Sequence, residues 1–288
     1  MTTTDTGTDA GGRAGARVVL EGRNLIKEYP VGARSGLLRR QRTMRAVDDV
    51  SIALAQGRVT ALVGQSGSGK STLGRMLARL IPATEGQILL DGREVPTQGS
   101  AGHREYVGDV QLILQDPFAS LNPLRRAAYT LGRAVRIHQE VRGEAAVQER
   151  CVQLLERVGL TPAKRYLDRF PHELSGGERQ RVSFARALAA SPTVLIADEP
   201  VSMLDVTIRK EMLDLIDSLR RDEDLAVLYI THDLGSARRY SDDVMVMHHG
   251  RVVEAGESRS VIDDPQHEYT KRLLAAAPNP AARPTQGP

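Results

Sequence analysis

Apolar residues along the chain follow two spacings, and each spacing predicts a kind of element. Short apolar runs bounded by polar residues or glycine predict strands at 46–55, 59–63, 86–90, 193–197 and 225–230. Apolar residues three or four positions apart predict helices at 71–80, 144–158, 178–190 and 206–221. Strand and helix alternate, and this order is typical of a mainly parallel sheet covered by helices on both faces. The predicted fold class is therefore α/β.

The stretch from about 116 to 174 has a different character, because strand-like runs vanish there. Within 144–158 the apolar side chains of Val147, Cys151 and Leu154 recur at helical spacing, and Gly159 stands where a C-terminal cap is expected. We interpret this stretch as a helical lobe inserted in the α/β core.

The N-terminal part carries two further features. Residues 1–16 are mostly small, polar or glycine, and they contain no apolar segment of the kind that a secretory signal has, so we expect a loose tail. The segment Arg34–Arg45 holds five arginines. Two interpretations stay open for it: a solvated surface loop, or a contact with acidic lipid headgroups or a membrane partner.

Composition narrows the function classes. The 288 residues are 41% hydrophobic and 26% charged, which allows a large core and excludes wholesale disorder. A net charge of +3 with 3% aromatic residues argues against nucleic-acid binding. The single Cys151 excludes an intrachain disulfide and a four-cysteine metal site. Because no apolar run approaches the roughly 18–20 residues of a membrane span, we expect a protein that is soluble by itself.

The segment that follows the strand at 59–63 matches the phosphate-binding pattern G-x-x-x-x-G-K-[ST]. Its residues are Gly64, Gln65, Ser66, Gly67, Ser68, Gly69, Lys70 and Ser71. The glycines let successive N–H groups point at a polyphosphate, and the following helix adds its positive N-terminal end. Lys70 would reach the β- and γ-phosphates, and the Ser71 hydroxyl would bind Mg²⁺. A glycine-rich turn without function is the alternative, but the preceding strand and the following helix favour the phosphate loop.

Two acids follow the apolar run Thr193–Ala197. In parallel sheets ligands bind at the carboxyl ends of strands, where Asp198 and Glu199 stand. Asp198 is placed to hold Mg²⁺, and Glu199 could accept a proton from an attacking water.

A second anion-binding end is predicted at LSGGERQ, where Ser175, Gly176 and Gly177 begin a helix. One chain rarely needs two such ends for one nucleotide. A natural solution is that the second end serves a nucleotide held by a neighbouring subunit.

Together, GQSGSGKST, LSGGERQ, IADEP and ITHD resemble the ATP-binding cassette (ABC) family, from about residue 18 to 278. The resemblance implies a P-loop fold with an N-terminal antiparallel β-subdomain, an ABC ATPase domain over 17–278 and the helical lobe at 116–174. It also places four more residues: Gln115 as a sensor of Mg²⁺ and γ-phosphate, Asp205 in a loop that crosses a dimer interface, His232 at the γ-phosphate, and Tyr29 stacked on adenine. The Asp205 loop has Met203 where alanine is more usual. An ordinary core tyrosine is the alternative for Tyr29.

The site implied by this resemblance has three parts. Catalysis is assigned to Glu199, His232, Lys70 and Gln115, and Mg²⁺ binding to Ser71, Gln115 and Asp198. Nucleotide contacts are assigned to Tyr29, Gly64 through Thr72, Gln115, Asp198, His232 and, across the dimer, Ser175, Gly176, Gly177 and Asp205. The other histidines lack the spacing of metal ligands, and we expect His248 and His249 to be exposed turn residues.

Two segments resemble a narrower group, the importers of oligopeptides, dipeptides and nickel. They are QDPFASLNP at 115–123 and PQHEYTKRLL at 265–274, within a predicted C-terminal extension at 264–288. A surface helix without a special role is the alternative for the second segment.

The function implied is ATP hydrolysis that energises uptake of peptides or a related small solute. The implied cofactors are ATP and Mg²⁺. The implied partners are transmembrane permeases, a second ABC ATPase subunit that is identical or similar, and indirectly an extracytoplasmic solute-binding protein, with the chain at the cytoplasmic face of the membrane and no nucleic acid bound. Two alternatives stay open: a non-transport ABC ATPase acting on nucleic acid or ribosomes, and a regulatory nucleotide switch.

Overall fold

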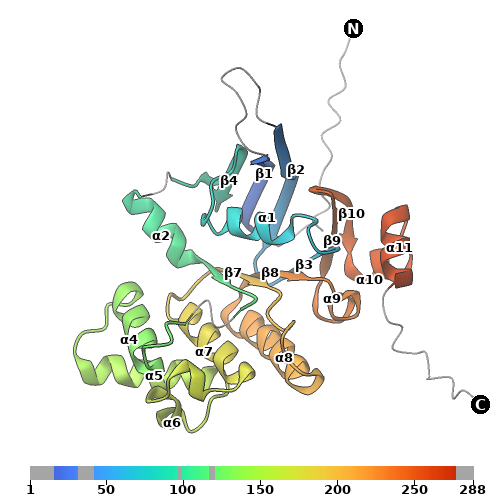
Figure 1. Cartoon of the computed structure of the whole chain (residues 1–288). Helices are drawn as coiled ribbons and strands as arrows, with labels where there is room; N and C mark the ends of the chain where they lie inside the picture. The colour runs from blue at the N-terminus through green and yellow to red at the C-terminus, as the bar shows by residue number, and fades with distance from the viewer. Residues whose placement is uncertain (1–15, 32–41, 97–98, 117–120, 277–288) are drawn as a thin grey trace, which may run out of the picture.

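A computed structural model describes residues 16–31, 42–96, 99–116 and 121–276. In this structure two sheets lie at an angle to each other, with helices around them (Figure 1). Residues 1–15, most of the arginine-rich segment, 117–120 of the QDPFASLNP segment and 277–288 of the predicted extension lie outside the described residues.

The larger sheet has the strand order β10-β9-β3-β8-β7-β6. Its strands are β3 (Val59–Val63), β6 (Val110–Ile113), β7 (Val194–Asp198), β8 (Ala226–Thr231), β9 (Asp243–His248) and β10 (Arg251–Glu257). All neighbours pair in parallel except β9 and β10, which form an antiparallel pair at one edge. The predicted mainly parallel sheet is thus confirmed.

The smaller sheet is antiparallel, in the order β2-β1-β4-β5. Its strands are β1 (Val18–Val31), β2 (Arg42–Ala55), β4 (Glu85–Leu90) and β5 (Arg93–Glu94). Strand β2 begins before the predicted position 46, so the prediction of a surface loop through Arg45 is wrong at its end. Arg45 pairs across the sheet with Glu28, and this pairing extends the ladder into the basic segment.

Helices flank the larger sheet and form a separate group at one end of the molecule. They are α1 (Lys70–Leu77), α2 (Ala101–Asp109), α4 (Ala127–His138), α5 (Glu144–Arg157), α6 (Ala163–Leu167), α7 (Gly176–Leu188), α8 (Val206–Glu223), α9 (Leu234–Tyr240), α10 (Ser258–Asp263) and α11 (Glu268–Ala276), with a short 3₁₀ turn at Pro171–Glu173. Figure 1 shows α4, α5 and α6 gathered on the side away from the antiparallel sheet.

The central strands are buried on both faces, which explains their continuous apolar runs. In β8, Val227 and Tyr229 join a core that extends into α4, α5 and α7. Ala226 and Leu228 point the other way, into a core shared with α1 and the antiparallel sheet. Because side chains alternate along a strand, the apolar residues of β8 are divided between two cores.

Helix α5 shows how well periodicity predicts local structure. It spans Glu144–Arg157, buries Val147, Cys151 and Leu154, and is followed by Gly159 at a φ of 76°. These observations confirm the predicted helix and its glycine cap. Among the described residues, no helix combines the length and apolarity that crossing a bilayer requires.

The lobe core gives a test of this packing. Leu155 of α5 is fully buried, whereas Leu124, which precedes α4, is 82% exposed. Leu155→Ala should lower the free energy of unfolding by about 2–5 kcal/mol because it leaves a cavity. Leu124→Ala, the matched control, should change it by less than about 0.5 kcal/mol. Urea unfolding measures both, and equal costs would contradict the described packing.

Candidate functional site

Four neighbouring parallel strands deliver the predicted site residues to one edge of the sheet. The order β3-β8-β7-β6 means that the segments after these strands lie side by side. After β3 comes the loop that begins at Gly64, after β8 comes His232, β7 ends at Asp198 with Glu199 next, and Gln115 follows β6. The topology therefore brings together residues from four separate parts of the chain.

The loop between β3 and α1 is held in a tight curve. Gly69 has a φ of 105°, and a Cβ there would collide with the carbonyl oxygen of Ala46. The loop is also tied to its surroundings, because the Gly250 N–H donates to the carbonyl of Ser68 at 2.9 Å. The hydroxyl of Ser68 is buried and has no hydrogen-bond partner within the described part of the chain. The loop is therefore concave, and it holds a polar hydroxyl, that of Ser68, without a partner among the described residues. Binding of a polyphosphate requires a concave loop with polar groups of this kind.

Lys70 is a cation buried inside this loop. Its side chain is 5% exposed, and Nζ donates to the carbonyls of Gly64 at 2.8 Å and Gln65 at 2.9 Å. Burial lowers the pKa of Lys70, although Glu199 and Asp198 act in the opposite direction. Carbonyl oxygens carry only partial charge, so an incoming phosphate would be a stronger partner for the ammonium group.

Ser71 and Asp198 form a pair of hard oxygen ligands. The Ser71 hydroxyl donates to Oδ1 of Asp198 at 2.9 Å. Burial raises the pKa of Asp198, against the lowering effect of the Ser71 hydrogen bond. No group of three or more His, Cys, Asp or Glu side chains suited to a metal occurs among the described residues. A hydroxyl with one carboxylate fits Mg²⁺ nonetheless, since Mg²⁺ keeps several waters and binds substrate phosphates.

Glu199 is held from both sides. Gln115 Nε2 donates to Oε2 at 3.1 Å, and His232 Nδ1 lies 3.4 Å from Oε1. The backbone of Glu199 is left-handed, with a φ of 46°, and its N–H donates to the carbonyl of Ile230. Such a backbone is uncommon for a residue other than glycine, and residues held in this way are often found at functional sites.

One cleft of about 1910 Å³ joins these groups. The predicted residues that line it are Tyr29, Gly64, Gln65, Ser66, Gly67, Gly69, Lys70, Ser71, Thr72, Gln115, Glu199 and His232. Tyr29 is 37% exposed, so it is not an ordinary core tyrosine. Asp198 lies behind the cleft and reaches it through Ser71.

The second predicted anion site lies elsewhere. Of the described residues that line the cleft, none is Ser175, Gly176, Gly177 or Asp205. Ser175 caps α7: its Oγ accepts from the Glu178 N–H at 3.2 Å, and Glu178 accepts from the Ser175 N–H at 2.7 Å.

The Ser175 segment and the Asp205 loop lie together. Asp205 caps α8 by accepting from the N–H groups of Thr207 and Ile208. A Cβ on Gly177 would come within 2.7 Å of the Ile208 side chain, so glycine is needed for the first turns of α7 and α8 to approach. The two segments that the sequence assigns to a dimer interface are therefore neighbours in this chain.

The family model described as ABC transporter matches residues 47–202, more than half of the chain. The chain belongs to the ABC transporter family. Its fold is that of an ABC ATPase cassette, and the predicted family and fold class are confirmed.

Curated relatives agree with this assignment. The glutathione import ATP-binding protein GsiA of Escherichia coli K12 is 46% identical over 261 residues, and that of Salmonella typhimurium LT2 is 44% identical over 261. Each match covers 90% of this chain and 41% of the relative, so the chain spans about two fifths of their length.

Solved structures give the same fold. The ATP-binding cassette MJ0796, in a dimeric post-hydrolysis state with ADP and Pi, matches with a TM-score of 0.72 at 25% identity, over 83% of this chain and 99% of that one. CbiO1 of Clostridium perfringens matches with a TM-score of 0.72 at 25% identity, over 86% and 92%.

Two side chains at or beside the cassette's cleft differ from what the sequence predicts. Arg45, at the end of the segment predicted as a surface loop or a membrane contact, lines the cleft and binds Glu28 and Asp48. His248 is half-buried, and its ring stacks on Tyr269 at 3.8 Å, so its prediction as an exposed turn residue is wrong. His249 is exposed as expected and lines the cleft. The local sequence holds no signal for the His248 contact, because its partner Tyr269 is 21 positions away on α11.

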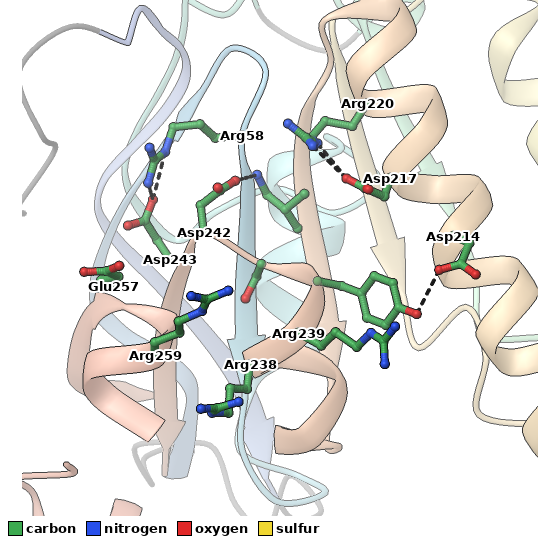
Figure 2. A pocket seen from close by; sticks show the side chains of 13 residues that line it. Arg58, Asp214, Asp217, Arg220, Arg238, Arg239, Asp242, Asp243, Glu257 and Arg259 are labelled. Atoms are coloured by element: carbon green, nitrogen blue, oxygen red, sulfur yellow. Dashed lines mark hydrogen bonds and ion pairs between the residues drawn. The ribbon is translucent and has the colours of Figure 1, made fainter. Parts of the chain in front are cut away.

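A second cleft of about 730 Å³ lies beside α8 and α9 (Figure 2). Acidic and basic side chains alternate around it, and Figure 2 shows pairs such as Arg58 with Asp243 and Arg220 with Asp217. Charges of both signs therefore line this cleft, and several of them neutralise each other in pairs.

Two glycines of the phosphate loop provide a matched test of its curvature. Both have positive φ, but a Cβ on Gly67 would meet nothing within 4 Å, whereas one on Gly69 meets the Ala46 carbonyl. Gly67→Ala should cost about 1–2 kcal/mol of unfolding free energy through backbone strain alone. Gly69→Ala should cost clearly more, as measured by denaturant unfolding. The loop geometry is contradicted if the two substitutions cost the same.

Proposed function

We propose that this chain is the ATP-binding and ATP-hydrolysing subunit of an ABC importer, and that it energises uptake of a peptide or related small solute. One observation carries the proposal: Lys70, the Ser71–Asp198 pair and the Gln115–Glu199–His232 group converge on one cleft. The relatives named as import proteins for glutathione, itself a small peptide, support the choice of transport and of substrate class.

In the proposed binding mode, ATP lies along the cleft with its phosphates in the Gly64–Thr72 loop. Lys70 leaves its two carbonyl partners and pairs with the β- and γ-phosphates. Tyr29 lies on the rim of the same cleft, where its partly exposed ring can stack on adenine. Ser71, Asp198 and Gln115 would hold Mg²⁺, which supplies positive charge against the phosphate oxygens when bound.

In the proposed reaction, Glu199 accepts a proton from the attacking water. Its carboxylate is oriented by Gln115 on one oxygen and by His232 on the other. An oriented base needs less reorganisation before proton transfer, and this step contributes typically about 10²–10⁴-fold to a rate. His232 and Gln115 are also within reach of a γ-phosphate placed between Lys70 and Glu199.

The active unit in this proposal is a dimer of ATPase subunits, identical or similar. Ser175, Gly176 and Gly177 would close on the nucleotide of the partner subunit, with Asp205 beside them. Two observations support this: the Ser175 segment lies outside its own chain's cleft, and the neighbouring apolar side chains of Met203 and Val206 are 65% and 79% exposed. The dimeric MJ0796 cassette offers a precedent for such pairing.

Membrane permeases are the proposed mechanical partners. The helical lobe exposes Leu124, Tyr129 and Ile137, which are apolar side chains that a permease could cover. The chain would then act as a peripheral protein at the cytoplasmic face, with an extracytoplasmic solute-binding protein engaging the permeases from the other side. The nearly neutral charge and the import relatives favour this proposal over an ATPase that acts on nucleic acid or ribosomes.

Glu199→Gln tests the assignment of the base. Without a proton acceptor, ATP hydrolysis should fall by about 100-fold or more, while ATP remains bound and holds two subunits together. Phosphate release measures the first effect, and light scattering with and without ATP measures the second.

Glu211→Gln is the matched control, because Glu211 is an exposed glutamate that pairs with Arg181 away from the cleft. It should hydrolyse ATP at the wild-type rate. Normal turnover by Glu199→Gln would refute the role of Glu199, and a strictly monomeric, ATP-bound Glu199→Gln would refute the shared site.

A further inference from the structure

Helix α11 (Glu268–Ala276) touches the phosphate loop although more than 200 positions separate the two in sequence. Tyr269 of α11 is 4% exposed, and its hydroxyl accepts a hydrogen bond from the Gln65 N–H at 3.2 Å. Farther along α11, Leu273 and Leu274 line the nucleotide cleft. Figure 1 shows α11 at the edge of the molecule next to α10 and β10. Nothing in the proposed ATPase reaction uses this contact.

The start of α11 is fixed by hydrogen bonds to β10 and to itself. Glu254 of β10 accepts from the N–H groups of Gln266 at 2.7 Å and His267 at 3.2 Å. The His267 ring nitrogen Nδ1 accepts from the Tyr269 N–H at 3.1 Å. The position of the Tyr269 backbone is therefore set by three contacts that leave its side chain free to reach the loop.

The Tyr269 ring is fixed by stacking. His248, at the end of β9, stacks on it with ring centres 3.8 Å apart and planes inclined by 24°. Burial lowers the pKa of His248, which favours the neutral imidazole in this stack at neutral pH. The following turn holds the loop at a second point, since Gly250 donates to Ser68. The β9–β10 turn and α11 thus form one support for the first half of the phosphate loop.

The peptide group between Gly64 and Gln65 is the point where this support acts. Its N–H, that of Gln65, donates to the Tyr269 hydroxyl at 3.2 Å, and its carbonyl, that of Gly64, accepts from Lys70 Nζ at 2.8 Å. When Lys70 turns to a phosphate, the carbonyl loses its charged partner. The Tyr269 hydroxyl then remains to keep the peptide in place.

We propose that Tyr269 is a positioning residue for nucleotide binding, whose hydroxyl holds the Gly64–Gln65 peptide group so that the phosphate loop keeps its binding curvature when Lys70 engages phosphate. This inference rests on the proposed ATP-binding function. Tyr269 acts through the loop and touches none of Glu199, Gln115 or His232 in the contacts described above. It therefore sets affinity for the nucleotide and leaves the chemical step unaffected.

Tyr269→Phe tests this by removing one oxygen atom while keeping the ring that stacks on His248. The Gln65 N–H then loses the oxygen to which it donates, and the Kd for AMP-PNP with Mg²⁺ should rise by about 3- to 10-fold. In steady-state ATP hydrolysis, KM should rise by a similar factor while kcat stays within about twofold of wild type. Calorimetric titration and phosphate release measure these quantities.

Tyr240→Phe is the matched control. The Tyr240 hydroxyl donates to Asp214 at 2.9 Å, beside the second cleft and away from the phosphate loop. This variant also loses one tyrosine hydroxyl, but its Kd, KM and kcat should equal those of wild type. Without nucleotide, amide hydrogen exchange at Gln65 should accelerate in Tyr269→Phe and stay unchanged in Tyr240→Phe. This exchange rate reports on the phosphate loop directly, even if ATPase activity is low.

These measurements distinguish a failure of the positioning role of Tyr269 from a failure of the proposed function. If wild type and Tyr269→Phe bind AMP-PNP equally well, the positioning role is overturned and the proposed function stands. If the wild-type chain binds no nucleotide, the proposed function fails and this inference fails with it. A fall in kcat without a change in KM would also overturn the positioning role, because it would place Tyr269 in the chemical step.

Discussion

The site depends on one buried cation. Lys70 is almost fully buried, and its ammonium group is bound only to peptide carbonyls in the described structure, with the carboxylates of Asp198 and Glu199 acting at longer range. Burial disfavours the charged form, so this cation is stabilised most by a full negative charge brought to it. The loop is curved to make room for such a charge, and its curvature is fixed by Gly69 and by the Gly250 bond to Ser68. A phosphate bound in this loop would bring such a charge to Lys70.

The other elements of the fold place further functional groups around the phosphate loop. The parallel sheet places the Glu199 group and the Ser71–Asp198 pair at the same edge as Lys70, so binding and proposed hydrolysis share one cleft. Helix α7 presents Ser175 outside that cleft, which is why we propose that a second subunit supplies the opposing wall. Helix α11 adds a contact from a distant part of the chain, and we infer that Tyr269 and Lys70 hold opposite sides of the Gly64–Gln65 peptide group.

The parts of the fold and of the candidate site that depend on a local sequence pattern could be predicted from the sequence. The phosphate loop, the buried run before Asp198 and helix α5 each depend on spacing within about 15 residues, and the structure reproduces all three. Contacts across long separations could not be predicted in this way. The stacking of His248 on Tyr269 requires knowing that α11 folds back beside β9. The strand pairing of Arg45 with Glu28 likewise leaves no local signal in the arginine-rich segment. The division of the site between two subunits follows from resemblance and stays a prediction.

The most direct measurement of the central claim is the affinity of Lys70→Ala for ATP with Mg²⁺, determined by equilibrium titration beside Lys210→Ala, whose exposed ammonium pairs with Asp214. Losing the buried cation should weaken ATP binding by at least about tenfold, because a charge-assisted contact to phosphate is removed. The Lys210 variant should bind as wild type does. An unchanged ATP affinity in Lys70→Ala would contradict the account, since the loop would then hold its nucleotide without the charge on which the site is proposed to depend.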